Sequence, residues 1–309
     1  MSLKQTICAF ELLDSATANG DDIVALFADY LTVNVTSVYV VGTKGSSDFV
    51  RIKIPGSQGK TQAGNAPTLG IIGRLGGVGA RPSRIGLVSD ADGAIAAIAC
   101  ALKLADMQQK GDVLLGDVII TTHICPDAPT RPHSPVDFMD SPIDDEIMGD
   151  YESIPEADAI LSLDTTKGNQ IINHKGYALS PTVKEGYILR VAEDLLCIME
   201  MTSGRRAVTF PITMQDITPY GNGIHHINSI MQPSTATMAP VVGVAICTES
   251  VVPGCATGAS HETDIALVVK FVIEVAKEFG RGICNFYDAE EYDRLVTLYG
   301  SMSHLQLVK

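Results

Sequence analysis

Apolar residues follow two spacings along the chain, and each predicts a different kind of element. After Asp92 they recur every three or four positions, at Ile95, Ile98 and Leu102, as on the buried face of a helix. The same spacing predicts helices over 5–31 (divided in two at Asn19-Gly20), 184–201 and 260–279, with a short helix over 224–230. Short apolar or β-branched runs predict strands over 38–41, 48–54, 68–72, 113–122, 159–163, 207–212 and 241–247.

The predicted strands alternate with the predicted helices, and four of the strands are continuous apolar runs. Strands of this kind are buried on both faces, so the pattern predicts an α/β fold with three layers, α/β/α, and a mostly parallel central sheet. We expect a single domain over residues 1–309. Two polar excursions, residues 55–67 and 127–155, are long enough to cover a site at the sheet.

Composition narrows the classes of partner. The chain is 46% hydrophobic and 19% charged, and its formal net charge of −14 argues against binding to nucleic acid or to an anionic membrane, which both require a basic face. The seven cysteines form no Cys-x-x-Cys pair, several lie in apolar runs, and no secretory signal or membrane-spanning run is visible. These features predict a cytoplasmic protein with reduced thiols that acts on a small molecule.

Polar side chains follow the carboxyl ends of the predicted strands. Arg74, His123, Asp127 and Asp164 each come after a strand, and His261 ends the loop after the last one. Ligands bind at this edge of open α/β sheets, and converging carboxylates and imidazoles suit a divalent metal. Taken singly, however, each acid is more often a helix cap or surface group, and each histidine more often a hydrogen-bonded structural residue.

Two other chemistries remain open at this edge of the sheet. Cys125 lies two residues after His123, as a nucleophile beside its base would, but a Pro-rich loop follows where a thiolate needs a helix N-terminus or a cation. The Gly-rich run 73–79 is the kind of loop that cradles phosphate, although the dinucleotide-binding spacing is absent.

In the order and spacing of these segments, the chain resembles the co-catalytic zinc aminopeptidases of the deblocking, tetrahedral-aminopeptidase type. Asp90–Ala97 lies where that family has a metal-bridging Asp opening a helix, and Asp117–Asp127 where a strand ends in a Glu-Glu pair. Ala157–Asp164 corresponds to a strand ending in a ligand Asp, and Val241–Ala266 to the segment with the last ligand His. The resemblance implies the aminopeptidase fold, a homo-oligomer, and metal ligands at Asp90, Asp164 and His261.

The chain departs from the family pattern at three positions. Arg74-Leu75-Gly76 stands where the family has a His-x-Asp pair, so one metal subsite lacks its histidine. Pro126 replaces the general-base Glu, and Asp127 replaces the neighbouring ligand Glu with a shorter acid. His226 lies in a turn where the family has a segment that lines the substrate. The classical aminopeptidase reaction is therefore not expected.

Two functions follow from this pattern. The first is a divergent metal-dependent hydrolase of a small amide or peptide-like substrate, with a divalent metal (zinc, by the resemblance) on Asp90, Asp127, Asp164 and His261. In this hypothesis His123 transfers protons, while Arg74 and His226 bind substrate. The second is a non-catalytic protein of the same fold that binds a small anionic ligand or acts in assembly, because a guanidinium near carboxylates can stand in for a metal's charge.

Overall fold

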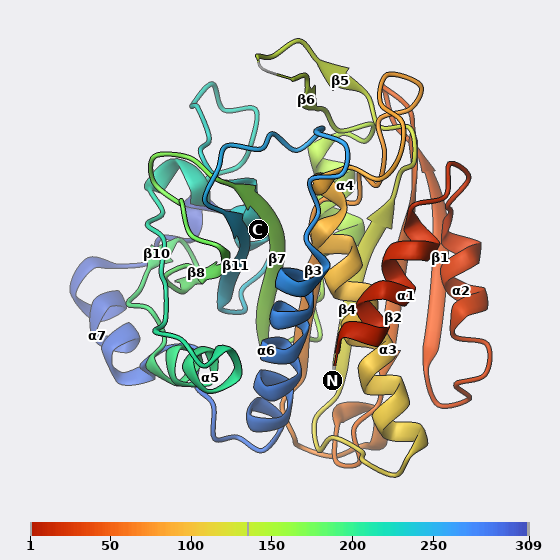
Figure 1. The fold of residues 1–309 in the computed structure, drawn as a ribbon. Coiled ribbons are helices and arrows are strands. Elements are labelled where there is room, and N and C mark those ends of the chain that lie inside the picture. The colour runs from red at the N-terminus through yellow and green to blue at the C-terminus, as the bar shows by residue number, and fades with distance from the viewer. Residues whose placement is uncertain (1, 135, 308–309) are drawn as a thin grey trace.

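One continuous mixed sheet runs through the computed structural model, which describes residues 2–134 and 136–307 (Figure 1). Residue 135, inside the predicted excursion 127–155, lies outside the described residues. The strand order is β1-β2-β4-β3-β7-β11-β9-β10, and β8 also pairs with β11. These strands are β1 (Asn34–Val41), β2 (Ser46–Ile54), β3 (Leu69–Gly73), β4 (Val118–Ile124), β7 (Ala159–Lys167), β8 (Gly176–Leu179), β9 (Val183–Lys184), β10 (Tyr187–Ile188) and β11 (Val241–Thr248).

The four central strands β4, β3, β7 and β11 are parallel to one another. Every residue of β3, β4 and β11 is buried, as their continuous apolar sequences predict. In the β3 register Gly73 lies beside Thr122 of β4 and Leu163 of β7. Arg74, the next residue, therefore enters the structure alongside Asp164, at the carboxyl ends of three parallel strands.

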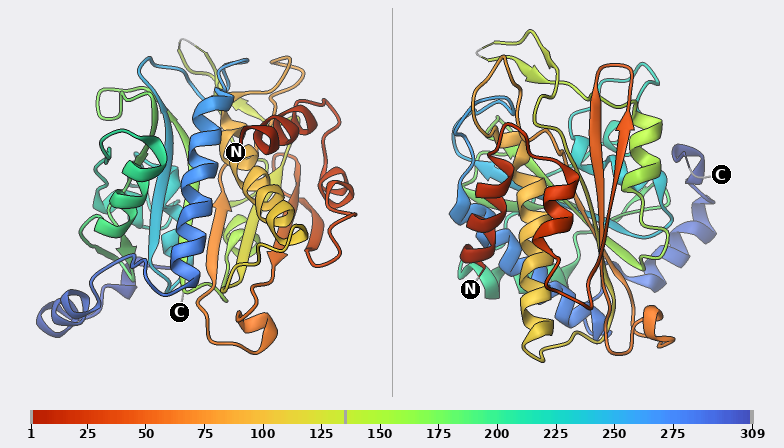
Figure 2. Two further views of the ribbon diagram at one scale, coloured as in Figure 1. Left: turned by 60° about the horizontal axis from the view of Figure 1, so that its bottom comes forward. Right: turned by 90° about the vertical axis from the view of Figure 1, so that its right-hand side faces the viewer.

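Helices cover both faces of the sheet, which confirms the predicted three-layer α/β/α fold. Leu69 and Ile71 face one core with α1 (Leu3–Leu13), α3 (Asp92–Gln109), α5 (Glu193–Ser203) and α6 (Glu262–Gly280). Ile72 faces a second core with Ile154 and with Met231 of the 3-10 helix η4 (Ser229–Ala236). Seen along the sheet, α1, α2 (Gly20–Leu26) and α3 lie on one side and α4 (Asp145–Glu152) on the other (Figure 2, right).

The predicted break at Asn19-Gly20 is confirmed, and its cause is a capping box. The Asn19 side chain accepts hydrogen bonds from the backbone N–H groups of Asp21 and Asp22, while the Asp22 carboxylate accepts one from the Asn19 N–H. α1 ends at Leu13 and α2 begins at Gly20, directly after the Asn19 cap, so two helices form where the apolar spacing alone is nearly continuous.

The predicted helix over 184–201 is wrong in its first half. Residues 183–188 form the hairpin β9–β10, in which Glu185 and Gly186 have φ values of 48° and 80°. A two-residue hairpin turn of type I′ has positive φ at both positions, and Glu-Gly is a weaker signal for it than Asn-Gly. The helix begins only at Glu193. Residues 207–212 form no strand beyond an isolated bridge at Thr209.

The two predicted excursions lie at opposite edges of the sheet. Residues 55–67 join β2 to the amino end of β3, and Asp117 accepts hydrogen bonds there from the backbone N–H groups of Gly56 and Thr61. Residues 127–155 instead follow the carboxyl end of β4 and contain a small ribbon, β5 (Thr130–Arg131) with β6 (Phe138–Met139), and then α4. The excursion 127–155 is therefore the one beside Arg74, and its second half is helical rather than irregular.

The C-terminal part of the chain adds α7 (Ala289–Tyr299) and the short turn η5 (Ser303–Leu305), for which the sequence analysis makes no prediction. The chain then returns to η4, where the Leu307 N–H donates to the carbonyl of Thr235 at 2.8 Å. Within the described residues, none of the helices has the length and apolar character needed to cross a bilayer.

Candidate functional site

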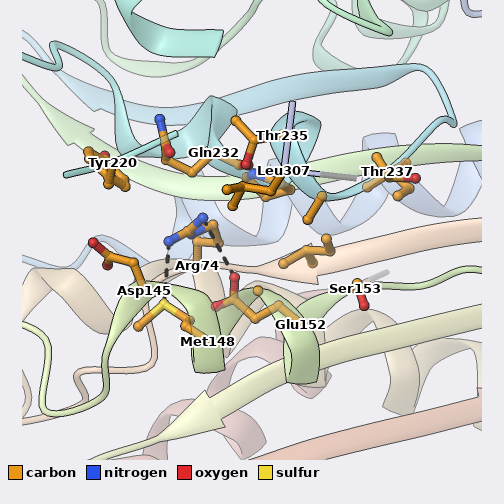
Figure 3. A pocket seen from close by; sticks show the side chains of 15 residues that line it. Arg74, Asp145, Met148, Glu152, Ser153, Tyr220, Gln232, Thr235, Thr237 and Leu307 are labelled. Carbon is orange, nitrogen blue, oxygen red and sulfur yellow. Dashed lines mark hydrogen bonds and ion pairs between the residues drawn. The ribbon is translucent and has the colours of Figure 1, made fainter. Parts of the chain in front are cut away.

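Arg74 lies at the centre of the carboxyl edge, buried on the face covered by α4. Its Nη1 lies 3.6 Å from Glu152 Oε2, and its Nη2 lies 3.5 Å from the sulfur of Met148 (Figure 3). Neither contact is a short, well-formed hydrogen bond, and the Arg74 Nε has no hydrogen-bond partner. The guanidinium is thus held in place by α4 but is left with unused donors.

Glu152 was not among the candidates from the sequence, although it is the acid nearest to Arg74. It is the last residue of α4, and Asp145, Met148 and Glu152 have the spacing of one helix face. This spacing is a sequence signal for a helix, but the Pro- and Asp-rich composition of the segment favoured the prediction of an irregular loop. Burial raises the pKa of Glu152, and the positive charge of Arg74 opposes the rise. One carboxylate oxygen of Glu152, Oε1, has no hydrogen-bond partner.

Asp164 reaches the same place from β7. Its Oδ2 accepts a hydrogen bond from the Ser229 hydroxyl at 2.9 Å, and its Oδ1 accepts one from the Thr165 N–H at 2.7 Å. Burial raises the pKa of Asp164 to about 6, against the opposing effects of Arg74 and Ser229. Asp164 therefore changes its charge near neutral pH.

Asp90 and Asp92 occupy the turn that opens α3, on the opposite side of Arg74 from α4. The Asp90 carboxyl lies between the backbones of Gly77 and Gly254, where there is no room for a side chain. Burial raises the pKa of Asp90 well above its ordinary value, and the negative charges of Asp164 and Asp92 add to the rise. Asp92 forms a buried ion pair with Lys167. Lys167 is thus paired with Asp92, and the cation that opposes the rise in the pKa of Asp90 is Arg74.

His123, the predicted proton-transfer residue, has both ring nitrogens engaged. Nε2 accepts a hydrogen bond from the Gly76 N–H at 3.0 Å, and Nδ1 lies 2.8 Å from the Ser47 hydroxyl. The first contact requires an unprotonated Nε2, so Nδ1 carries the ring proton. Burial, with the charge of Arg74 adding to it, lowers the pKa of His123 to about 3. In this arrangement His123 fastens the loop after Arg74 to β4.

Of the predicted metal ligands, the structure brings Asp90 and Asp164 towards each other but not the other two. Asp127 is exposed at the start of the excursion, where Cys125 Sγ lies 3.7 Å from its Oδ1. His261 is exposed at the N-cap of α6. Burial raises the pKa of the Cys125 thiol to about 12, which suits a structural cysteine rather than a nucleophile.

The predicted substrate-binding residue His226 lies beside the wall of a cavity. Its Nδ1 is 3.3 Å from Gln232 Nε2, and its ring is 4.2 Å from that of Tyr220. Tyr220 and Gln232 line a cavity of about 70 Å³ together with Arg74 and Glu152 (Figure 3). This volume holds roughly two water molecules, or a ligand of only a few non-hydrogen atoms.

The residues at this edge do not fit a metal centre of the aminopeptidase type. Among the described residues, no group of three or more His, Cys, Asp or Glu side chains is placed to hold a metal ion. Arg74 already supplies a positive charge among Asp90, Asp164 and Glu152. A cation at the same place would meet electrostatic repulsion from the guanidinium.

The comparisons place this geometry among known folds. The sequence profile of a family described as "Protein of unknown function (DUF1177)" matches residues 38–309. No curated protein matches the chain in sequence. In structure the chain is similar to the bottromycin maturation enzyme BotP in complex with Mn, with a TM-score of 0.56 and 12% identity over 89% of this chain and 71% of BotP.

Two further solved structures have the same fold. Tomato leucine aminopeptidase matches with a TM-score of 0.56 and 10% identity over 88% of this chain, which spans 61% of the tomato enzyme. Glutaminyl cyclase from an Acidobacteriales bacterium matches with a TM-score of 0.52 and 10% identity over 91% of this chain and 94% of the cyclase. At these identities the likeness shows the fold, and the resemblance to the aminopeptidase fold is thereby confirmed.

Proposed function

Because the chain belongs to the DUF1177 family and has the aminopeptidase fold without a cluster of metal ligands among its described residues, we propose that it is a metal-independent binding protein for a small polar ligand. The ligand occupies the cavity between α4 and η4 and carries a carboxylate or amide oxygen at one end and an ammonium or amide N–H at the other. An amino acid or a small amide has this chemistry.

One observation carries the proposal. Arg74 Nε is a buried donor without an acceptor, and Glu152 Oε1 is a buried acceptor without a donor, and both residues line the same cavity. Unpaired buried polar groups are destabilising by roughly 1–3 kcal/mol each. Neither atom is exposed at the cavity wall, so a ligand that supplies an oxygen to Arg74 and an N–H to Glu152 removes both penalties once the two side chains turn slightly toward the cavity.

The charges around the cavity favour a ligand without net negative charge. Arg74 is the cation beside the cavity, whereas Asp145 and Glu152 also line it and Asp164 lies close to Arg74. A simple anion would gain from Arg74 but be repelled by the three acids. A zwitterion or an amide can place an oxygen at the positive Arg74 and an N–H group at the acids. The proposal therefore keeps the predicted role of Arg74 in binding a carboxylate and adds Glu152 as the partner for the other end of the ligand.

Metal-dependent hydrolysis of a small amide is the competing function. It is supported by the fold shared with BotP, whose structure contains Mn, and by the acids Asp90 and Asp164 near one another. It requires Asp127 and His261, which are exposed, to join this pair in one ligand set, and the described residues form no such set. The proposed binding function needs no such rearrangement.

Isothermal titration of the purified chain with amino acids, small amides and inorganic anions tests the proposal. We expect one class of zwitterion or amide to bind, and Arg74→Met and Glu152→Gln each to weaken binding about tenfold or more, as the loss of a charged hydrogen-bond partner does. Arg190→Met is the control, because Arg190 is exposed and pairs with Glu291 far from the cavity. The proposal is overturned if wild type and all variants bind the ligand equally well, or if wild type binds none of the ligands tested.

Elemental analysis of the chain purified without chelator addresses the competing function. We expect less than one equivalent of any divalent metal, with no change on adding Mn²⁺ or Zn²⁺. Stoichiometric metal that is lost in Asp164→Ala and His261→Ala variants would favour the hydrolase instead.

A further inference from the structure

The outer edge of β1 is a free sheet edge with an unusual composition. β1 pairs with β2 on one side, and no other strand of the described chain pairs with it. Its sequence, NVTSVYVV, contains no charged residue, proline or glycine over eight positions. Exposed edges of this length normally carry a lysine, a proline or a bulge that prevents pairing with another chain. The edge faces the viewer in Figure 2 (right), between α2 and α4, with no element across it.

Large apolar side chains are exposed along this edge. Tyr39 is 66% exposed and Val41 is 68% exposed on one face of the strand, and Val38 is 44% exposed on the other. On the Val38 side, Thr36, Val38 and Phe49 form a shallow groove with Tyr151 of α4. Apolar residues gathered along an unpaired backbone indicate a surface that is covered by a partner.

We propose that β1 pairs antiparallel with β1 of a second copy of this chain, so that one sheet runs through a two-fold dimer. A two-fold axis at Val40 places Tyr39 of each copy opposite Val41 of the other. Aromatic and β-branched residues are favourable neighbours across antiparallel strands. In this register the β1 residues that pair are Tyr39, Val40 and Val41 of each copy, so the exposed side chains of Tyr39 and Val41 are covered and the free backbone groups of this segment are satisfied.

The absence of charged residues in β1 favours a second copy of the chain over a basic protein as the partner at this edge. The chain has a net charge of −14, but the eight residues of β1 contribute nothing to it. A basic partner would find no acidic side chain on the strand, whereas two copies meet there without direct repulsion between like charges. The remaining long-range repulsion between two acidic molecules is screened by salt, so the dimer becomes tighter as ionic strength rises.

Sedimentation velocity and light scattering across a range of concentrations test the dimer. We expect wild type to have twice the 32.8 kDa mass of the chain, and the double variant Tyr39→Lys/Val41→Lys to be monomeric at concentrations where wild type is dimeric. Loss of two cross-strand pairs with repulsion between the introduced lysines corresponds to weakening by about tenfold or more.

The matched control is Leu298→Lys/Tyr299→Lys on α7, where the two side chains are 64% and 69% exposed. This variant should remain a dimer. Hydrogen exchange gives a second measurement, because the outward amides of the segment Tyr39–Val41 should be protected in wild type and lose protection in the β1 variant while the rest of the sheet keeps it. A monomeric wild type, an open-ended polymer, or a dimer broken by the α7 variant and not by the β1 variant would refute β1 pairing.

Discussion

Arg74 determines the electrostatics of the carboxyl edge. Three buried acids, Asp90, Glu152 and Asp164, lie within its electrostatic influence, and its positive charge opposes the rise in the pKa of each. Removing one partner from a buried charged group is destabilising by about 3–5 kcal/mol. The guanidinium therefore stabilises the fold and at the same time has donors left for a ligand.

At the residue scale, Asp164→Asn tests the electrostatics of this edge. The carboxyl has an ordinary pKa of 3.8, and burial raises the pKa of Asp164 to about 6 in the folded chain. Between these pH values the folded state binds more protons than the unfolded state, so wild-type stability falls as pH rises from about 4 to about 6. Asparagine does not ionise, so the stability of the variant does not fall in this pH range. The free energy of unfolding of Asp164→Asn, relative to that of wild type, should therefore rise between about pH 4 and about pH 6 by on the order of 3 kcal/mol.

Urea unfolding at a series of pH values measures this difference. Ser229→Ala is the matched control, because it keeps the carboxyl but removes a hydrogen bond that lowers the pKa of Asp164. In Ser229→Ala the pH range over which stability falls should therefore extend to higher pH than in wild type. Parallel stability curves for wild type and Asp164→Asn would show that Asp164 does not titrate in this range.

Among the elements, α3 has the most constrained position. It lies between the sheet and the helices α1 and α6, and nearly all of its residues from Asp92 to Ala105 are buried. Its first turn approaches the ends of β3 and β7 so closely that Gly93 lies against the carbonyl oxygens of Arg74 and Leu163. The close contact positions Asp90 and Asp92 beside the strand ends.

The substitution Gly93→Ala should therefore be strongly destabilising. Its methyl group would overlap backbone atoms that cannot move away, so we expect a loss on the order of 3 kcal/mol in the free energy of unfolding. Gly149→Ala in α4 is the control, because the nearest atom to its added methyl group is 3.9 Å away. Alanine there should be neutral or stabilising by about 0.5–1 kcal/mol. Equal effects of the two substitutions in thermal or denaturant unfolding would contradict the tight approach of α3.

In the whole molecule, packing is uneven between the centre and the C-terminal end. α3 and α6 are largely buried against the sheet, whereas no residue of α7 is buried and the helix projects from the body (Figure 1). Its main attachments are aromatic contacts of Tyr292 with Tyr187 and Tyr287, together with Lys184 lying 5.0 Å from the Tyr292 ring. Elements with few buried contacts open at a lower free energy than the whole domain.

Hydrogen exchange with mass spectrometry tests this uneven stability. We expect the amides of α7 to exchange at least about a hundredfold faster than those of α6, because opening α7 exposes little apolar surface. Equal protection of the two helices would show that α7 unfolds only with the whole chain.

Much of the fold could be predicted from the sequence, because its main elements depend on local patterns. The continuous apolar runs became the buried strands β3, β4, β7 and β11, and the three-to-four spacing became α3 and α6. The β9–β10 hairpin was missed because its turn, Glu-Gly, is a weak local signal. α7 was missed although its sequence carries a helix signal, with an N-cap at Asp288 and helical spacing of Tyr292, Leu295 and Tyr299.

The sequence alone determined that polar side chains collect at one edge of a parallel sheet, because strand polarity and helix spacing follow from neighbouring residues. It placed Arg74, Asp90 and Asp164 in one region on that basis. Only the tertiary structure decided that Glu152 joins them, that His123 is engaged at both nitrogens, and that Asp127 and His261 face outward. Those outcomes depend on how segments distant in the chain pack together, and no local pattern encodes that packing.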